Sequence, residues 1–119
     1  MYSELYSEND RILLFGARPD NESLIPGEIV PDNLVLGLKS LADPSRLQIM
    51  RYLVQGKYTQ ADLSRKLRLR APTITHHLHE LRLAGLVGFE IEGSSRYYTA
   101  RKANIHQVFS MLNDFLEKS

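Results

Sequence analysis

Residues 71–85, "APTITHHLHELRLAG", decide the fold and carry three histidines within four positions. Pro72 fits the first turn of a helix, where no amide hydrogen is needed, and Gly85 is typical of the residue that ends one. Between them the apolar side chains recur at helical spacings of four and three: Ile74, Leu78 and Leu81. We therefore predict a helix over about 71–84, with one apolar edge against a core.

The histidines divide between the two faces of this predicted helix. His77 lies three residues after Ile74, so it shares the apolar edge, and we expect it to be buried and bonded to a nearby carbonyl. The opposite face carries four polar side chains: Thr75, His76, His79 and Arg82. Such a face can donate hydrogen bonds to phosphates and base edges, as a helix in the major groove of DNA does. This pattern favours a DNA-reading helix.

A zinc site and a catalytic cluster are the alternative interpretations of the histidines. His76 and His79 are spaced for two ligands on a helix, but a structural zinc site needs four, and the chain has no cysteine. Glu80 is one position out of phase with them. No nucleophile with a base and an orienting acid is evident, and no glycine-rich phosphate loop appears. We expect no enzyme, no metal and no cofactor.

Three shorter helices are predicted upstream. Leucine spacing predicts the first over about 32–42. In the motif "DPSR", Asp43 can cap the second helix, whose first position suits proline. Thr59 can cap the third, with Asp62 three residues later as a capping-box variant. A short helix, a tight turn and the histidine helix then form a helix-turn-helix unit.

A two-stranded ribbon and a last helix are predicted downstream. Apolar and other residues alternate in "LVGFEIE", Gly93 and Ser94 supply a turn, and a second strand returns, so the ribbon spans about 86–99. The last helix, over about 102–117, carries a wide apolar stripe. The expected fold is mainly α with one β ribbon, an α+β arrangement of four helices, ribbon and C-terminal helix.

Charge is distributed unevenly along a chain whose net charge is only +1. Residues 57–102 hold nine basic against four acidic side chains, whereas residues 1–43 hold three against eight. Four cations crowd the linker before the histidine helix: Arg65, Lys66, Arg68 and Arg70. We interpret them as phosphate contacts, with Arg96 of the ribbon reaching the adjacent backbone or minor groove. An ordinary solvated surface is the alternative for any one of them.

The first 31 residues differ from the rest of the chain. They contain three prolines and one short strand-like run, "RILLFGAR" at 11–18. We expect 1–31 to be an arm or the remnant of a preceding sensor domain, and 32–119 to be the folded domain. No apolar run reaches the roughly 18 residues of a membrane span, and no signal peptide is evident, so we expect a soluble cytoplasmic protein.

Three stretches resemble the ArsR-type winged helix-turn-helix regulators of bacteria: "LKSLADPSRLQIMRYL", "TQADLSRKLRLRAPTITHHLHELRLAGLV" and "IEGSSRYYTA". The resemblance covers roughly 34–116 in the right order. It implies a homodimeric repressor with its recognition helices in successive major grooves of a pseudo-palindromic operator and the wing, 86–99, beside them. By position it implies DNA contacts from these residues: Ala71, Thr73, Thr75, His76, His79 and Arg96.

The resemblance also implies a dimer interface between the first and last helices. Its expected residues are Leu34, Val35, Leu38, Ile105, Val108, Phe109, Leu112, Phe115 and Leu116. The alternative for the last-helix stripe is the core of the chain itself. A protein-docking role of the winged helix also remains open.

The chain departs from the family pattern at several positions. Relatives often carry Gly at the position of Arg68 and a capping Ser at that of Arg70, so the cap is expected to be lost here. A family metal site on the last helix corresponds to Asn104, His106 and Glu117, and Asn104 is a poor ligand. A metal sensor using His106 and Glu117 therefore stays an alternative only.

Overall fold

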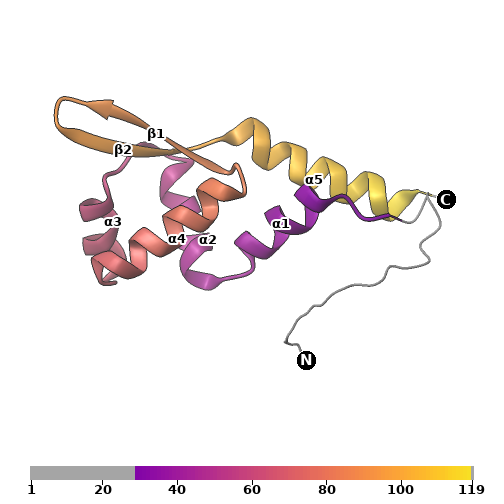
Figure 1. The fold of residues 1–119 in the computed structure, drawn as a ribbon, viewed down its shortest axis with the longest axis horizontal. Helices are drawn as coiled ribbons and strands as arrows, with labels where there is room; N and C mark the ends of the chain where they lie inside the picture. Colours follow the sequence, from indigo (N-terminus) through magenta and orange to yellow (C-terminus); the bar gives the residue numbers. More distant parts are fainter. Residues whose placement is uncertain (1–28, 119) are drawn as a thin grey trace.

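The computed structural model describes residues 29–118, which form five helices and one antiparallel pair of strands (Figure 1). The elements are α1 (Asp32–Leu41), α2 (Pro44–Leu53), α3 (Gln60–Leu67), α4 (Ala71–Leu83), β1 (Val87–Glu92), β2 (Ser95–Ala100) and α5 (Lys102–Glu117). The predicted fold class and element order are confirmed. The strand expected at 11–18 lies outside the described residues, and the domain boundary at 31/32 stays a prediction.

The helices and the ribbon occupy distinct parts of the molecule. Helices α2, α3 and α4 pack together beneath the β1–β2 ribbon, whereas α5 leads away from the ribbon and runs beside α1 (Figure 1). Helix α4 contacts α1, α2, α3 and β1. It is therefore held by four of the six other elements, and its orientation depends on how they pack.

Two predicted caps determine where helices begin. The Asp43 carboxylate accepts hydrogen bonds from the amides of Ser45 (2.8 Å) and Arg46 (3.2 Å), which satisfies free donors at the start of α2. Thr59 and Asp62 form a reciprocal capping box at the start of α3. The amide hydrogen bond from Thr59 is the main reason that the pKa of Asp62 lies below its ordinary value. Both local motifs act as predicted.

The core lies between α4 and the elements around it. Its most completely buried side chains are Leu34, Ile49, Leu63, Ile74, Leu78, Leu81 and Leu86. Leu47 of α2 and Ala61 of α3, by contrast, are exposed. With α2 starting at Pro44, its inward face carries Ile49, Met50 and Leu53 instead.

Helices α1 and α5 approach each other closely at Gly37. A β-carbon added at Gly37 would lie 2.8 Å from Cγ2 of Val108, so only glycine allows this spacing without movement. Leu34 and Val108, both expected at a dimer interface, are consequently buried in the chain's own core, at 2% and 6% exposure. Both side chains therefore pack within the chain, and the dimer interface itself stays a prediction.

The other predicted interface residues retain surface to different degrees. Four are half-buried against the core: Leu38, Ile105, Leu112 and Phe115. Three are exposed, namely Val35, Phe109 and Leu116. Helices α1 and α5 therefore still expose apolar side chains, but fewer of them than the apolar stripe in the sequence suggested.

The ribbon is fastened to the rest of the domain at two places. Its register pairs Val87 with Ala100 and Glu92 with Ser95, which leaves Gly93 in the turn at φ 63°. Tyr98 exchanges two backbone hydrogen bonds with Tyr58, of 2.8 and 3.2 Å, in the linker before α3. At the base of the ribbon, the Asn104 amide nitrogen donates to the Gly85 carbonyl over 2.6 Å. These bonds set the position of the ribbon relative to α4.

Candidate nucleic-acid interface

The outward face of α4 is polar from Thr73 to Arg82 and carries the exposed Leu83 at its C-terminal end. Ile74, His77, Leu78 and Leu81 are buried, whereas the predicted contact residues are exposed: Ala71, Thr73, Thr75, His76, His79 and Arg82. The helical period alone accounts for this separation, because one edge of α4 packs on the core. The face carries donors and acceptors of the size that base edges require.

Thr75 differs from the other exposed residues of this face. Its hydroxyl donates a hydrogen bond of 2.9 Å to the carbonyl of Ala71, one turn earlier in the helix. Its hydrogen is thus already used, which the sequence did not indicate. Thr75 offers the oxygen lone pairs and a methyl group, which suit a base amino group or the thymine methyl.

His77 is buried as expected, but its partner is different. Arg46 Nε, in the first turn of α2, donates to His77 Nδ1 over 3.0 Å, in place of the expected bond to a carbonyl. Nδ1 can accept only when it carries no proton. Burial is the main cause that lowers the pKa of His77, opposed by the nearby Asp43 carboxylate and reinforced by the Arg46 guanidinium. The structure therefore holds a neutral imidazole between α2 and α4.

This arrangement predicts that the protein becomes less stable as the pH falls. Because the pKa of folded His77 lies below its ordinary value of 6.5, the unfolded chain binds the proton first. The stability that the neutral ring contributes is present above the ordinary value and is lost as the pH falls from there through the folded value. Urea unfolding at pH values from about 7.5 to about 5.5 measures the slope.

A His77→Gln variant is the control for this measurement, since it removes the titrating ring. It should show a flatter dependence in the same window. The lowered pKa of Asp43, caused first by the amide of Arg46, acts at more acidic pH, below its ordinary value of 3.8, and does not confuse the result. Equal slopes in both proteins would contradict the assignment to His77.

Arg68 occupies the turn between α3 and α4 in a left-handed conformation, with φ 56° and ψ 42°. It has the only positive φ among the non-glycine residues of the described chain. A side chain is disfavoured in this region of φ and ψ by about 1–2 kcal/mol. The strain gives a physical reason for a glycine at this position in other proteins, and it makes the arginine here conspicuous.

We predict that Arg68→Gly is more stable than Arg68→Ala by about 1 kcal/mol, because only glycine is relaxed at this φ. Both variants lose the same charge, so they should lose DNA affinity equally. Urea unfolding measures the first difference and salt-dependent DNA binding the second. Equal stability of the two variants would show that the turn is unstrained.

The linker cations do not form one continuous surface. Arg65 pairs with Asp62, its neighbour on α3. Lys66 turns toward α2, with its ammonium 5.6 Å from the ring centres of both Tyr52 and Tyr58. Arg70 is exposed at the start of α4 and makes no side-chain cap, as predicted. Of the four, Arg68 and Arg70 lie nearest in sequence to α4, and Lys66 and Arg68 both line a groove between α2 and α3.

Two predicted contact arginines meet on one aromatic ring. The guanidinium carbons of Arg82, from α4, and Arg96, from β2, lie 4.7 and 4.2 Å from the centre of the Phe89 ring on β1. Such cation–π contacts limit the motion of both side chains. Phe89 therefore connects α4 to the ribbon. The alternating strand pattern showed that Phe89 faces one side, but not which residues it meets.

Arg101 is a further basic residue that the sequence did not single out. It lines a groove of about 400 Å³ between α4 and β1 together with His79 and Arg82. The sequence offered one signal for Arg101, which is its position in the basic segment of residues 57–102. The groove extends the positive surface from α4 to the base of the ribbon.

Metal and membrane features were searched over residues 29–118. In this range no group of three or more His, Cys, Asp or Glu side chains could hold a metal ion. His106 and Glu117 are both exposed on α5. None of the described helices is long and apolar enough to pass through a bilayer.

Comparison with known proteins adds a consistent set of similarities. Residues 43–88 match the sequence profile of bacterial regulatory proteins of the arsR family. A biofilm growth-associated repressor of Agrobacterium fabrum is 39% identical over 61 residues, which are 51% of this chain and 52% of that protein. The arsenical resistance operon repressor of Staphylococcus aureus is 32% identical, over 64% of this chain and 73% of the repressor.

A solved structure shows the same architecture. It is the homodimeric winged helix-turn-helix DNA-binding domain of a Mycobacterium bovis protein described as a possible ArsR-family transcriptional regulator. It superposes with a TM-score of 0.60 at 26% identity, over 74% of this chain and 85% of that one. The chain thus spans about half of the Agrobacterium repressor but most of this domain.

Proposed function

Because the chain belongs to the ArsR family of bacterial regulatory proteins, whose members are transcriptional regulators and not enzymes, we propose that it is a homodimeric repressor of transcription. It binds a pseudo-palindromic DNA operator in the cytoplasm. The observation that carries the proposal is the two-sided structure of α4, with one edge in the core and an exposed opposite face of Thr, His and Arg side chains.

In this proposal α4 enters the major groove and its exposed side chains contact base edges. Thr73, Thr75, His76 and His79 determine which sequence is preferred. The phosphates are contacted by the cations around α4, which add affinity without sequence preference. These are Arg65, Arg68, Arg70, Arg82 and Arg96. The stacking of Arg82 and Arg96 on Phe89 supports this role because it holds both charges on the same side of the ribbon.

The proposed dimer joins the exposed apolar side chains of α1 and α5. Val35, Phe109 and Leu116 are exposed there, and large exposed apolar groups at one end of a small domain favour association. The homodimeric state of the similar Mycobacterium bovis domain supports the same assembly. Two copies related by a two-fold axis would present two α4 helices to half-sites about one helical turn apart, roughly 34 Å.

A salt-dependent mobility-shift titration tests the proposal. Binding sites are first selected from random duplexes, and the affinity for the selected duplex and for random DNA is then measured at several salt concentrations. We expect tighter binding of the selected duplex, a steep loss of affinity with salt, and a selected sequence with two-fold symmetry. If no duplex binds even at low salt, the protein-docking interpretation of the winged helix replaces the DNA-binding one.

A further inference from the structure

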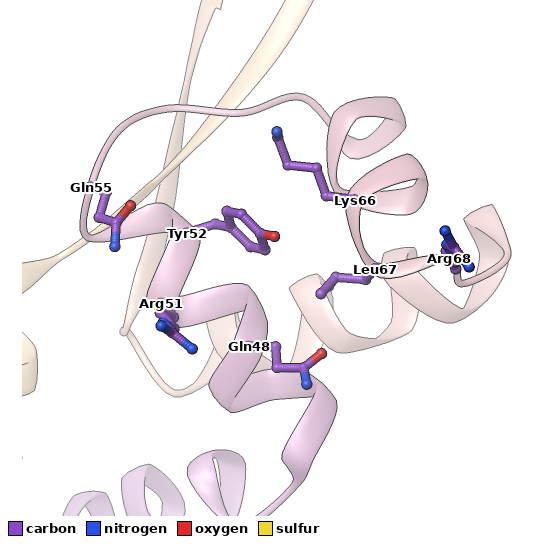
Figure 2. Close-up of a pocket in the computed structure, with 7 residues that line it drawn as sticks. All are labelled: Gln48, Arg51, Tyr52, Gln55, Lys66, Leu67 and Arg68. Atoms are coloured by element: carbon purple, nitrogen blue, oxygen red, sulfur yellow. The ribbon is translucent and has the colours of Figure 1, made fainter.

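A second positively charged surface lies on the side of α2 and α3, apart from the outward face of α4. These two helices form a groove of about 500 Å³ (Figure 2). It is lined by three cations, Arg51, Lys66 and Arg68, by Gln48 and Gln55, and by Tyr52 and Leu67. No described residue of α4 or of the ribbon lines it. The groove is therefore distinct from the proposed base-reading face.

The charge of the groove is not balanced within the described residues. None of the lining residues is acidic. Among residues 29–118, the ion pairs join Lys57 to Glu90 and Glu92, and Arg65 to Asp62. Arg51 and Arg68 have no such partner among residues 29–118. Three like charges around one small space repel one another, and a bound anion would relieve that repulsion.

The arrangement of the groove also suits an organic ligand. Arg51 and Tyr52 lie three and four residues after Gln48, so the three share one side of α2, and Gln55 follows in the turn after the helix. Figure 2 shows the Tyr52 ring and the Leu67 side chain pointing toward each other between the helices. Lys66 is held in place by its contacts with two tyrosine rings. The result is an apolar floor with amide and cationic groups around it.

We propose that this groove binds a small organic polyanion that carries carboxylate or phosphate-ester groups, and that the anion regulates DNA binding. The two guanidinium groups match the paired oxygens of such groups, the glutamine amides donate further hydrogen bonds, and the floor receives the carbon skeleton. The volume falls in the range of roughly 300–1,000 Å³ that is usual for small-molecule sites.

The proposed regulation of DNA binding by the anion rests on the proposed function, and it depends on Arg68. This residue lines the groove and also lies in the turn before α4, where it is proposed to contact a DNA phosphate. An anion in the groove would engage the Arg68 guanidinium and lower the positive potential beside α4. Occupation of the groove is therefore expected to weaken DNA binding.

Calorimetric titration of the protein without DNA tests the site directly. The probes are citrate, for carboxylates, and glucose 6-phosphate, for phosphate esters, at constant ionic strength. We expect saturable binding of at least one probe, with one site per chain, and the stronger probe identifies the preferred group. If neither probe binds saturably, the proposal is overturned.

Three variants distinguish the groove from general surface charge. Arg51→Gln removes a lining cation that is not part of the DNA surface and should weaken binding about tenfold. Gln55→Glu adds a carboxylate to the groove and should weaken it at least as much. Lys39→Gln, on the exposed side of α1, removes an equal charge elsewhere and should change nothing. Equal affinity in all three variants and the natural protein would overturn the site.

The effect of the bound probe on DNA binding is measured in a separate experiment. The anion-binding proposal and the regulatory proposal can therefore fail independently. At constant ionic strength the bound probe should weaken duplex binding by the natural protein at least several-fold, and by Arg51→Gln much less. A probe that binds in the groove but leaves duplex affinity unchanged would overturn the regulatory part and leave the binding site intact.

Discussion

A Thr75→Ala/His79→Ala double variant is expected to lose most of its preference for the operator over random DNA, while keeping its fold. Both side chains are exposed on the outward face of α4, so their removal leaves no cavity in the core. Each good base contact contributes about 1–3 kcal/mol of discrimination. Operator affinity should therefore fall by about 2–6 kcal/mol, or about 30-fold to 20,000-fold, whereas affinity for random DNA should change little.

Mobility-shift titrations against the selected duplex and a random duplex measure this difference. Arg68→Ala is the matched control because it removes a phosphate contact, and it should weaken binding to both duplexes to a similar extent. Its salt dependence should also become shallower by about one unit of slope. If the double variant and Arg68→Ala reduce binding to the two duplexes in the same ratio, the proposed division between base and phosphate contacts is wrong.

An Ile74→Ala variant should have the largest effect on stability. Ile74 is fully buried, with 0% exposure, in the part of α4 that packs against the core. Truncation to alanine removes buried apolar contacts and leaves a cavity, which usually costs about 2–5 kcal/mol. Since a domain of this size is stable by about 5–15 kcal/mol, a substantial share of its stability would be lost.

Urea unfolding followed by circular dichroism measures the change in the free energy of unfolding. Thr73→Ala provides a control on the same helix, because Thr73 is exposed and its truncation should change stability by less than about 0.5 kcal/mol. DNA binding by Ile74→Ala should weaken for operator and random duplexes together, as the population of folded α4 decreases. A loss smaller than about 1 kcal/mol would show that α4 is not anchored through Ile74.

Local patterns explain what was predicted correctly. The caps at Asp43 and Thr59 involve residues two or three positions apart, and such contacts form wherever the helix starts. The burial of His77 and the exposure of His76 and His79 were predictable for a similar reason. Once one edge of a helix is known to be buried, the helical period decides which side chains lie on the opposite, exposed face. The element order and the family resemblance followed from these signals.

The partners of the individual side chains were not predictable in this way. Arg46 and His77 are 31 positions apart, and their hydrogen bond depends on how α2 crosses α4. The close approach of Gly37 and Val108 likewise placed two expected interface residues in the core. Periodicity shows which edge of a helix is buried but not which helix it packs against.

The sequence by itself therefore determined the helices, their caps, the ribbon and the outward face of α4, because each depends on residues within a turn or two along the chain. Only the tertiary structure decided that Phe89 joins Arg82 to Arg96, and that Lys66 turns away from α4 into the groove beside α2. Those contacts join segments whose distance and angle are set by packing of the whole core. No local pattern of residue types contains that information.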